Sequence, residues 1–425
     1  MRHAVAHTLA MKLLQAASDE VIKEAGQIIR CRVSLVLAND ITAPLAIKSF
    51  RQMGAATVFD KTKIALVMDH FTPNKDIASA EQVRGIREFA QEQDILHYYE
   101  GGDCGVEHAL LPELGLVGPG DVVVGADSHT CTYGGLCAFA TGMGSTDIAG
   151  AMALGETWFK VPQTIYVQID GELSAYVGAK DLILHTIGKT GVDGARYKAL
   201  EFGGSTVAAL SVEGRLTMAN MAIEAGGKVG LFAADAKTLA FAKAHGHTAT
   251  QEIAPDAGAP YDEIIKIDAA SLSPQVACPH LPDNVRGVDE LAAEHIVVNQ
   301  SVIGSCTNGR IEDLREAAAI LKGRKVKKSV RCVVLPATPK IWTQALREGL
   351  LETFMEAGCI VGPPTCGPCL GGHMGILAKG ERAIATTNRN FKGRMGHLES
   401  EVYLSSPSLA AAAAVAGEIV HPASL

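Results

Sequence analysis

Three cysteines in the last third of the chain have a spacing that suits a metal or cluster site. Cys306 lies in the sequence GSCTNGR (304–310), whereas Cys366 and Cys369 form a C-x-x-C pair in GPPTCGPC (362–369). A C-x-x-C pair in a glycine- and proline-rich loop directs two sulfurs to the same side, as a zinc ion or an iron–sulfur cluster requires. Cys306 then supplies a third sulfur.

Two kinds of site are compatible with these cysteines. Three thiolates suit a 4Fe-4S cluster in which one iron has no protein ligand, and they suit structural zinc less well because that ion takes four ligands. An iron without a protein ligand is a Lewis acid that can hold the hydroxyl of a hydroxy acid. The spacing alone is equally compatible with a redox or zinc-binding C-x-x-C pair and Cys306 as a bystander.

Two segments place an acid beside a histidine directly after a predicted strand, namely Asp69-His70 and Asp127-Ser128-His129. A carboxylate next to an imidazole fixes its tautomer and stabilises its cation, so these residues are candidates for proton transfer. Taken singly, each segment is more typical of an Asp that caps a loop and a structural histidine. A serine hydrolase triad is not expected, because adjacent side chains point in different directions and triads come from distant segments.

Two arginines five residues apart offer carboxylate binding. Arg389 and Arg394 lie in NRNFKGR (388–394), and each guanidinium can bind a carboxylate through two parallel hydrogen bonds. In an isolated loop, two solvated surface arginines would be the simpler interpretation. The chain has 38 Lys plus Arg against 46 Asp plus Glu, a formal net charge of -8. This balance argues against nucleic acid as the main partner. An anionic substrate would have to be bound by a few individual Arg or His side chains, because the chain has no general excess of positive charge.

These motifs need a scaffold that brings their loops together. Apolar, β-branched runs bounded by turn residues predict strands at 31–37, 63–68, 121–125, 164–169, 295–303, 330–335, 358–361 and 382–386. Helical patterns lie between most of them, for example at 79–92, 311–322 and 341–357. Alternating strands and helices predict parallel sheets in an α/β protein, whose ligand sites lie beyond the carboxyl ends of the strands.

The chain of 425 residues is too long for one ordinary domain. An Ala-, Pro- and Gly-rich segment at 253–262, followed by several prolines, predicts a boundary near residue 290. Val161-Pro162 ends a glycine-rich region and predicts a softer boundary near residue 162. We therefore expect three α/β domains, at 1–162, 163–290 and 291–425.

The composition also predicts where the protein resides. The sequence contains no run of eighteen uncharged apolar residues, and its N-terminal segment lacks the apolar core and cleavage site of a signal peptide. Ten cysteines without an export signal are expected to be reduced thiols or metal ligands rather than disulfides. We expect a soluble, cytoplasmic protein.

Six ordered motifs resemble the aconitase superfamily, and among its branches the isopropylmalate dehydratase type. They are NDITAP (39–44), MDHFTP (68–73), GADSHT (125–130), GSCTN (304–308), the C-x-x-C loop and NRNFKGR (388–394). The similarity runs over essentially the whole chain. It implies an aconitase-like α/β fold of three domains with mainly parallel sheets around a 4Fe-4S cluster. Cys306, Cys366 and Cys369 would hold that cluster, with one iron free of protein ligands.

The resemblance also implies roles for the other residues of the site. Arg389 and Arg394 would bind substrate carboxylates, with Ser128 and Asn39 as further substrate contacts. The acid–histidine pairs around the open iron would be Asp69 with His70, His108 with Asp127, and His129 with Glu201. Two of these residues rest on short matches, His108 on VEHA (106–109) and Glu201 on LEFGG (200–204).

The implied activity is that of a hydro-lyase that moves a hydroxyl between neighbouring carbons of a dicarboxylic hydroxy acid. The substrates would be 2- and 3-isopropylmalate, interconverted in leucine biosynthesis. Aconitases take their catalytic base, a serine, from a C-terminal swivel domain, and no segment up to Leu425 resembles it. We therefore expect a small subunit of the swivel-domain type that supplies the serine, and neither nucleic acid nor a membrane as partner.

Three alternatives stay open. A homoaconitase or a dimethylmalate- or methylmalate-type dehydratase would share these motifs, because the small subunit largely selects the substrate side chain in proteins of this type. An apo-form RNA-binding regulator is a more distant alternative, against which the acidic charge balance argues. A zinc-binding structural protein is the simplest alternative.

Overall fold

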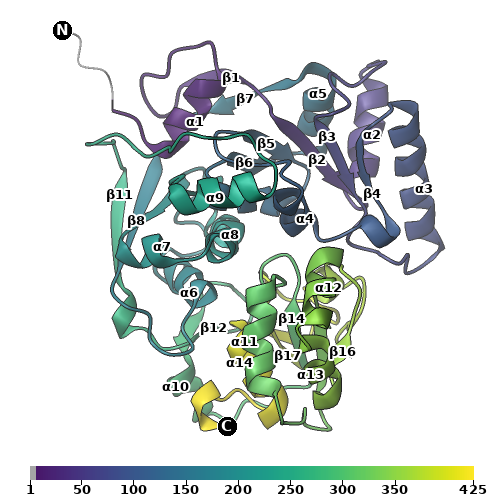
Figure 1. Cartoon of the computed structure of the whole chain (residues 1–425), viewed down its shortest axis with the longest axis vertical. Helices are drawn as coiled ribbons and strands as arrows, with labels where there is room; N and C mark the ends of the chain where they lie inside the picture. The colour runs from purple at the N-terminus through teal and green to yellow at the C-terminus, as the bar shows by residue number, and fades with distance from the viewer. Residues whose placement is uncertain (1–5) are drawn as a thin grey trace.

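Three mainly parallel sheets follow one another along the chain in a computed structural model that describes residues 6–425. In Figure 1 the elements of the first sheet are purple to blue, those of the second are teal, and most of those of the third are green to yellow. One hydrophobic core surrounds the first sheet and includes Ala199, Val229 and Leu231 of the second. A second core is shared by the second and third sheets, and the third sheet also packs around a core of its own side chains and helices.

The first sheet has five parallel strands in the order β4-β3-β2-β5-β6. Strands β2, β3 and β5 are buried along their whole length, as expected for parallel strands that helices cover on both faces. Its strands are β2 (Leu35–Asn39), β3 (Ile64–Val67), β4 (His97–Tyr99), β5 (Val122–Gly125) and β6 (Phe139–Gly142). Its helices are α1 (Leu9–Ala17), α2 (Ala43–Gln52), α3 (Ile77–Glu92), α4 (Glu107–Glu113) and α5 (Ser145–Leu154).

The second sheet has four parallel strands in the order β10-β9-β8-β11. Its strands are β8 (Thr164–Asp170), β9 (Ala199–Gly203), β10 (Val229–Phe232) and β11 (Glu263–Asp268). Its helices are α6 (Ala179–Thr190), α7 (Ser205–Ala209), α8 (Val212–Asn220) and α9 (Ala236–Ala244). Residues of α6 and α8 fill the core that this sheet shares with the third.

The third sheet has seven strands in the order β13-β12-β18-β17-β14-β15-β16, of which the last five are parallel. Its strands are β12 (Gln275–Ala277), β13 (Val285–Gly287), β14 (Gln300–Gly304), β15 (Arg331–Leu335), β16 (Ile360–Val361), β17 (Arg382–Ala385) and β18 (Glu401–Leu404). Its helices are α10 (Val288–Ala292), α11 (Ile311–Leu321), α12 (Pro339–Arg347), α13 (Leu350–Ala357) and α14 (Pro407–Ala416).

The predicted parallel α/β architecture is confirmed, with differences in detail. The segment 31–37 is not one strand, because β1 (Ile28–Arg32) pairs with β7 (Glu156–Lys160) in an antiparallel ribbon before β2 begins. The predicted helix 341–357 is two helices, since Gly349 has a φ of 74°, a left-handed conformation that ends α12. The domain limits stay a prediction. Strands β12 and β13 precede the predicted boundary near residue 290, although they pair within the third sheet.

Across residues 6–425, every helix is too short or too polar to cross a membrane.

Candidate active site

One cavity of about 240 Å³ collects the predicted site residues. All of them except Glu201 line it, together with Ile41, Thr42, Val106, Glu107, Leu370 and Asn388. Most of the lining comes from loops that follow β2, β3 and β5 of the first sheet and β14, β16 and β17 of the third. The carboxyl ends of the strands of two sheets therefore face the same cavity, which is where open α/β sheets place their ligands.

The three predicted cysteine ligands are buried side by side in this lining. Cys306, Cys366 and Cys369 have exposed fractions of only 4%, 6% and 2%. Contact with Cys366 lowers the pKa of the Cys306 thiol to about 5, against the opposing effect of burial. A depressed pKa favours the thiolate, which is the form that binds metal. The donor set thus fits a thiolate-bound metal group.

Close packing fixes the first cysteine loop. Gly304 has a φ of 126°, and a Cβ at this position would lie 2.1 Å from the carbonyl oxygen of Leu335. Only glycine fits there. The Thr386 hydroxyl bonds to both the N–H and the carbonyl of Gly304, at 2.9 Å each, and so ties this loop to the one that carries the arginines.

Polar groups also surround the cysteine sulfurs. The side-chain amide of Asn388 donates to Cys306 Sγ at 3.0 Å, and Arg394 Nη2 donates to Cys369 Sγ at 3.5 Å. Such donors stabilise negative charge on sulfur and tune metal–sulfur centres.

Backbone contacts join the cysteines to the first sheet. The amide N–H of Cys366 donates to the carbonyl oxygen of Asp69 at 3.0 Å, and the Thr365 hydroxyl donates to the same oxygen at 2.7 Å. The acid–histidine segment after β3 is therefore fixed directly against the C-x-x-C loop.

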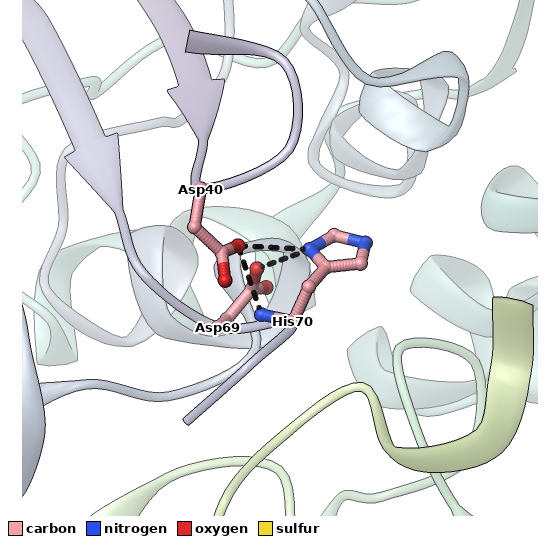
Figure 2. A group of neighbouring side chains, drawn as sticks. All are labelled: Asp40, Asp69 and His70. Carbon is pink, nitrogen blue, oxygen red and sulfur yellow. Dashed lines mark hydrogen bonds and ion pairs between the residues drawn. The ribbon is translucent and has the colours of Figure 1, made fainter. Parts of the chain in front are cut away.

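Two carboxylates contact the same ring nitrogen of His70, as Figure 2 shows. Its Nδ1 is 2.7 Å from Asp69 Oδ1 and 3.4 Å from Asp40 Oδ1, while Asp40 also accepts the backbone N–H groups of His70 and Phe71. Burial alone would lower the pKa of His70, but the charge of Asp69 and the bonds to Asp40 and Asp69 raise it well above the ordinary value. The two carboxylates therefore favour the cationic imidazole, and its other nitrogen points away from both of them.

Asp127 joins the two other histidines. Its Oδ1 is 3.1 Å from His108 Nε2 and accepts the backbone N–H of His129 at 2.7 Å. Burial opposes ionisation, but the bonds to these histidines dominate and lower the pKa of Asp127 well below its usual value. Asn39 donates to the other oxygen of Asp127 at 3.4 Å. The predicted contact between His108 and Asp127 is present.

Glu107 is a second acid beside His108. Its Oε1 accepts from Asn39 at 2.9 Å and lies 3.6 Å from His108 Nε2. Burial, and then the charges of Asp69 and Asp127, raise the pKa of Glu107 well above its usual value. The charged form of Glu107 is therefore disfavoured in this acidic, buried surrounding.

Both predicted arginines reach the cavity. Arg389 donates from Nε to Glu224 Oε1 at 2.7 Å, and the same oxygen is 2.8 Å from His129 Nε2. Arg394 lies beside Cys369, so the two guanidiniums flank the cysteine sulfurs and the histidines. A dicarboxylic acid could bind both of them within this cavity.

Comparison with known proteins identifies the family. Residues 11–417 match the model of the Aconitase family (aconitate hydratase). The chain belongs to the aconitase family. This membership implies an iron–sulfur cluster, which is consistent with the three buried cysteines.

Similar members of the family carry one name. The chain is 72% identical to the 3-isopropylmalate dehydratase large subunit of Nitratidesulfovibrio vulgaris (strain DSM 19637 / Miyazaki F) over 99% of this chain and 100% of that one. It is 60% identical to the protein of the same name from Moorella thermoacetica, over 98% of both chains. The crystal structure of aconitase X from Thermococcus kodakaraensis in its holo-form matches 89% of this chain and 88% of that chain, with a TM-score of 0.50 and 15% identity. This last likeness shows the aconitase-like fold.

The predicted pairing of His129 with Glu201 is wrong. Glu201 lies in β9, where its carboxylate accepts the backbone N–H of Leu9 at 3.0 Å and the Tyr261 hydroxyl at 2.6 Å. It therefore anchors the first helix and is a structural residue. The partner of His129 is Glu224, in the short 3-10 helix Met221–Ala225.

Sequence reasoning missed four polar residues around the cavity: Asp40, Glu107, Glu224 and Asn388. Three of them are neighbours of predicted residues, so the motifs contained a signal for them. The sequence contains no such signal for Glu224, because this residue lies outside all of the motifs.

Glutamine variants of Glu224 and Glu201 distinguish the site role of Glu224 from the structural role of Glu201. Glu224→Gln removes the charge that holds both Arg389 and His129, and we expect kcat/KM to fall by about 10² to 10³. Glu201→Gln should keep kcat/KM close to the parent value and lower the free energy of unfolding by about 1 kcal/mol, since its bonds are structural. Steady-state kinetics and urea unfolding measure both effects. An equal loss of activity in the two variants would contradict the assignment.

Proposed function

We propose that this chain is the large subunit of a 3-isopropylmalate dehydratase, which interconverts 2- and 3-isopropylmalate in leucine biosynthesis by removal and re-addition of water. One observation carries the proposal. The cysteines, the acid–histidine pairs and the two arginines line a single cavity, in a chain that is 72% identical to a protein of this name over nearly its full length.

The number of cysteines supports a 4Fe-4S cluster over a structural zinc ion. Such a zinc takes four protein ligands, whereas the cavity lining offers three buried cysteines. A cluster can be held by three thiolates and keep one iron free of protein ligands. When bound, it supplies a Lewis acid that makes the substrate hydroxyl a better leaving group.

The arginines hold the substrate carboxylates. Among the described residues, Glu224 engages Arg389 through Nε, which leaves the terminal nitrogens as a fork for a carboxylate. Arg394 adds a second guanidinium on the same side of the cavity. Their charges stabilise the carbanion that forms when the weakly acidic proton next to a carboxylate is removed.

His70 handles the proton on the hydroxyl side. Its Nδ1 is fixed by Asp69 and Asp40, which favour the cationic form, and it can give its other proton to the departing hydroxyl. His108 and His129, joined through Asp127, are fixed nearby in the same network. The base that removes the carbon-bound proton comes from the partner, in keeping with the name "large subunit" of the relatives.

Loss of a cysteine ligand should remove the cluster. We expect protein prepared without oxygen to be brown and to carry close to four irons per chain. Cys366→Ser should lose both the iron and the visible absorption. Cys332→Ala is the matched control, because Cys332 is a buried thiol within β15. This variant should keep the iron of the parent protein. Retention of full iron in Cys366→Ser would refute the ligand assignment.

Arg389→Lys should lower kcat/KM by about 10² to 10³, because an ammonium cannot reproduce the bidentate fork. Iron content should not change. Arg84→Lys is the control, since Arg84 is an exposed arginine on α3 that pairs with Glu81. Kinetics of the reconstituted enzyme measure the difference, and near-parent values for Arg389→Lys would place this residue outside the site.

The isolated, cluster-loaded chain should be inactive and should gain dehydratase activity on addition of a small subunit of the swivel-domain type. A small subunit whose catalytic serine is replaced by alanine is the control and should bind without restoring turnover. The assay follows the unsaturated intermediate by its ultraviolet absorbance. Robust turnover of 3-isopropylmalate by the chain alone would mean that the base lies within these 425 residues.

A further inference from the structure

Lys180 is a buried cation directly behind the site. It lies in the first turn of α6, and its side chain is among the largest that are fully buried, with 1% of the residue exposed. Its ammonium donates to three neutral oxygens, Thr386 O at 2.6 Å, Thr387 O at 2.7 Å and Asn308 Oδ1 at 3.3 Å. Burying an ammonium is costly even when it is hydrogen-bonded, so this position requires a physical reason.

These contacts join two loops of the site. Asn308 belongs to the loop of Cys306, and Thr386 and Thr387 begin the loop that carries Arg389 and Arg394. Lys180 reaches them from the second sheet unit, which otherwise contributes little to the cavity lining. The ammonium therefore fixes the spacing between a cysteine ligand and a substrate-binding arginine.

The contacts extend to the sulfur atoms. Thr387 precedes Asn388, whose amide donates to Cys306 Sγ at 3.0 Å. Asn308, which accepts from the same ammonium, lies two residues after Cys306. The ammonium is therefore held against both segments that flank this sulfur.

We propose that Lys180 is a positioning residue that holds the Cys306 loop and the Arg389 loop together and whose charge raises the reduction potential of the bound cluster. The effect on the reduction potential rests on the proposed function, because it requires a bound cluster. Charge near a cluster and hydrogen bonds to its sulfurs set its potential, and a nearby cation favours the reduced state. In Lys180→Met both effects are lost.

Three variants test the proposal. Lys180→Met removes the charge and the donors, whereas Lys180→Arg keeps the charge with a different shape. Lys189→Met is the matched control, because it removes a lysine from an exposed position of the same helix. Circular dichroism and iron content establish that each variant folds and loads, and Lys180→Gln replaces Lys180→Met if the latter does not fold.

The potential of the cluster is measured by redox titration followed by electron paramagnetic resonance. It should fall in Lys180→Met, return toward the parent value in Lys180→Arg and stay unchanged in Lys189→Met. In the active complex, KM should rise about tenfold in Lys180→Met, because the loops lose the hydrogen bonds of the ammonium and a single bond to a charged group already contributes about this factor. An unchanged potential in Lys180→Met, or an equal shift in Lys189→Met, would overturn the electrostatic role.

Hydrogen exchange of the metal-free chain tests the positioning role without the cluster. Amides of 304–310 and 386–394 should exchange about tenfold faster in Lys180→Met than in Lys189→Met, since local opening loses that bond energy. Unchanged exchange in both loops would overturn the positioning role. If the parent chain binds no iron, the proposed function fails, but the exchange experiment still decides whether Lys180 holds the loops.

Discussion

The carbonyl oxygen of Asp69 is the point on which the geometry of the site depends. It accepts the Cys366 N–H and the Thr365 hydroxyl, so the first sheet is fixed against the cysteine loop of the third by one backbone oxygen. The side chain of the same residue holds His70. The distance from His70 to the cysteines is therefore set by the main chain, which varies less than a contact between long side chains. Reactions that depend on near-attack geometry need such positioning.

The acidic groups of the cavity are held in place before any substrate arrives. Both oxygens of Asp40 accept backbone N–H groups, and Asp127 is held by His108 and the N–H of His129. Glu224 is held by a histidine and an arginine. Little reorganisation remains when charge develops on the substrate, which is the property that makes such sites effective. Burial and these contacts also shift the pKa values of two acids in opposite directions, raising that of Glu107 and lowering that of Asp127.

Local signals predicted most of this site, and non-local contacts account for what was missed. Asp69, Asp127 and Cys306 follow strands whose apolar runs are short and continuous, so sequence alone placed them at strand ends. The partner of His129 could not be found in this way, because Glu201 and Glu224 both lie in the second sheet unit and only packing decides which of them faces the cavity. Lys180 was missed for the same reason, since its acceptors lie more than a hundred residues further along the chain.

The arginines are incompletely enclosed, which agrees with the small-subunit partner that the relatives' name "large subunit" implies. The side chain of Arg389 remains 22% exposed, and it also lines an adjoining hollow of about 720 Å³ together with Arg394, Phe391 and Lys392. Water in that hollow screens a guanidinium and weakens its effect on a neighbouring carbanion. Under the proposed function, a subunit that covers the hollow would do two things at once: it would bring the base to the substrate and remove the solvent that competes for the arginines. If so, a partner without the proposed serine would still tighten substrate binding while leaving turnover absent.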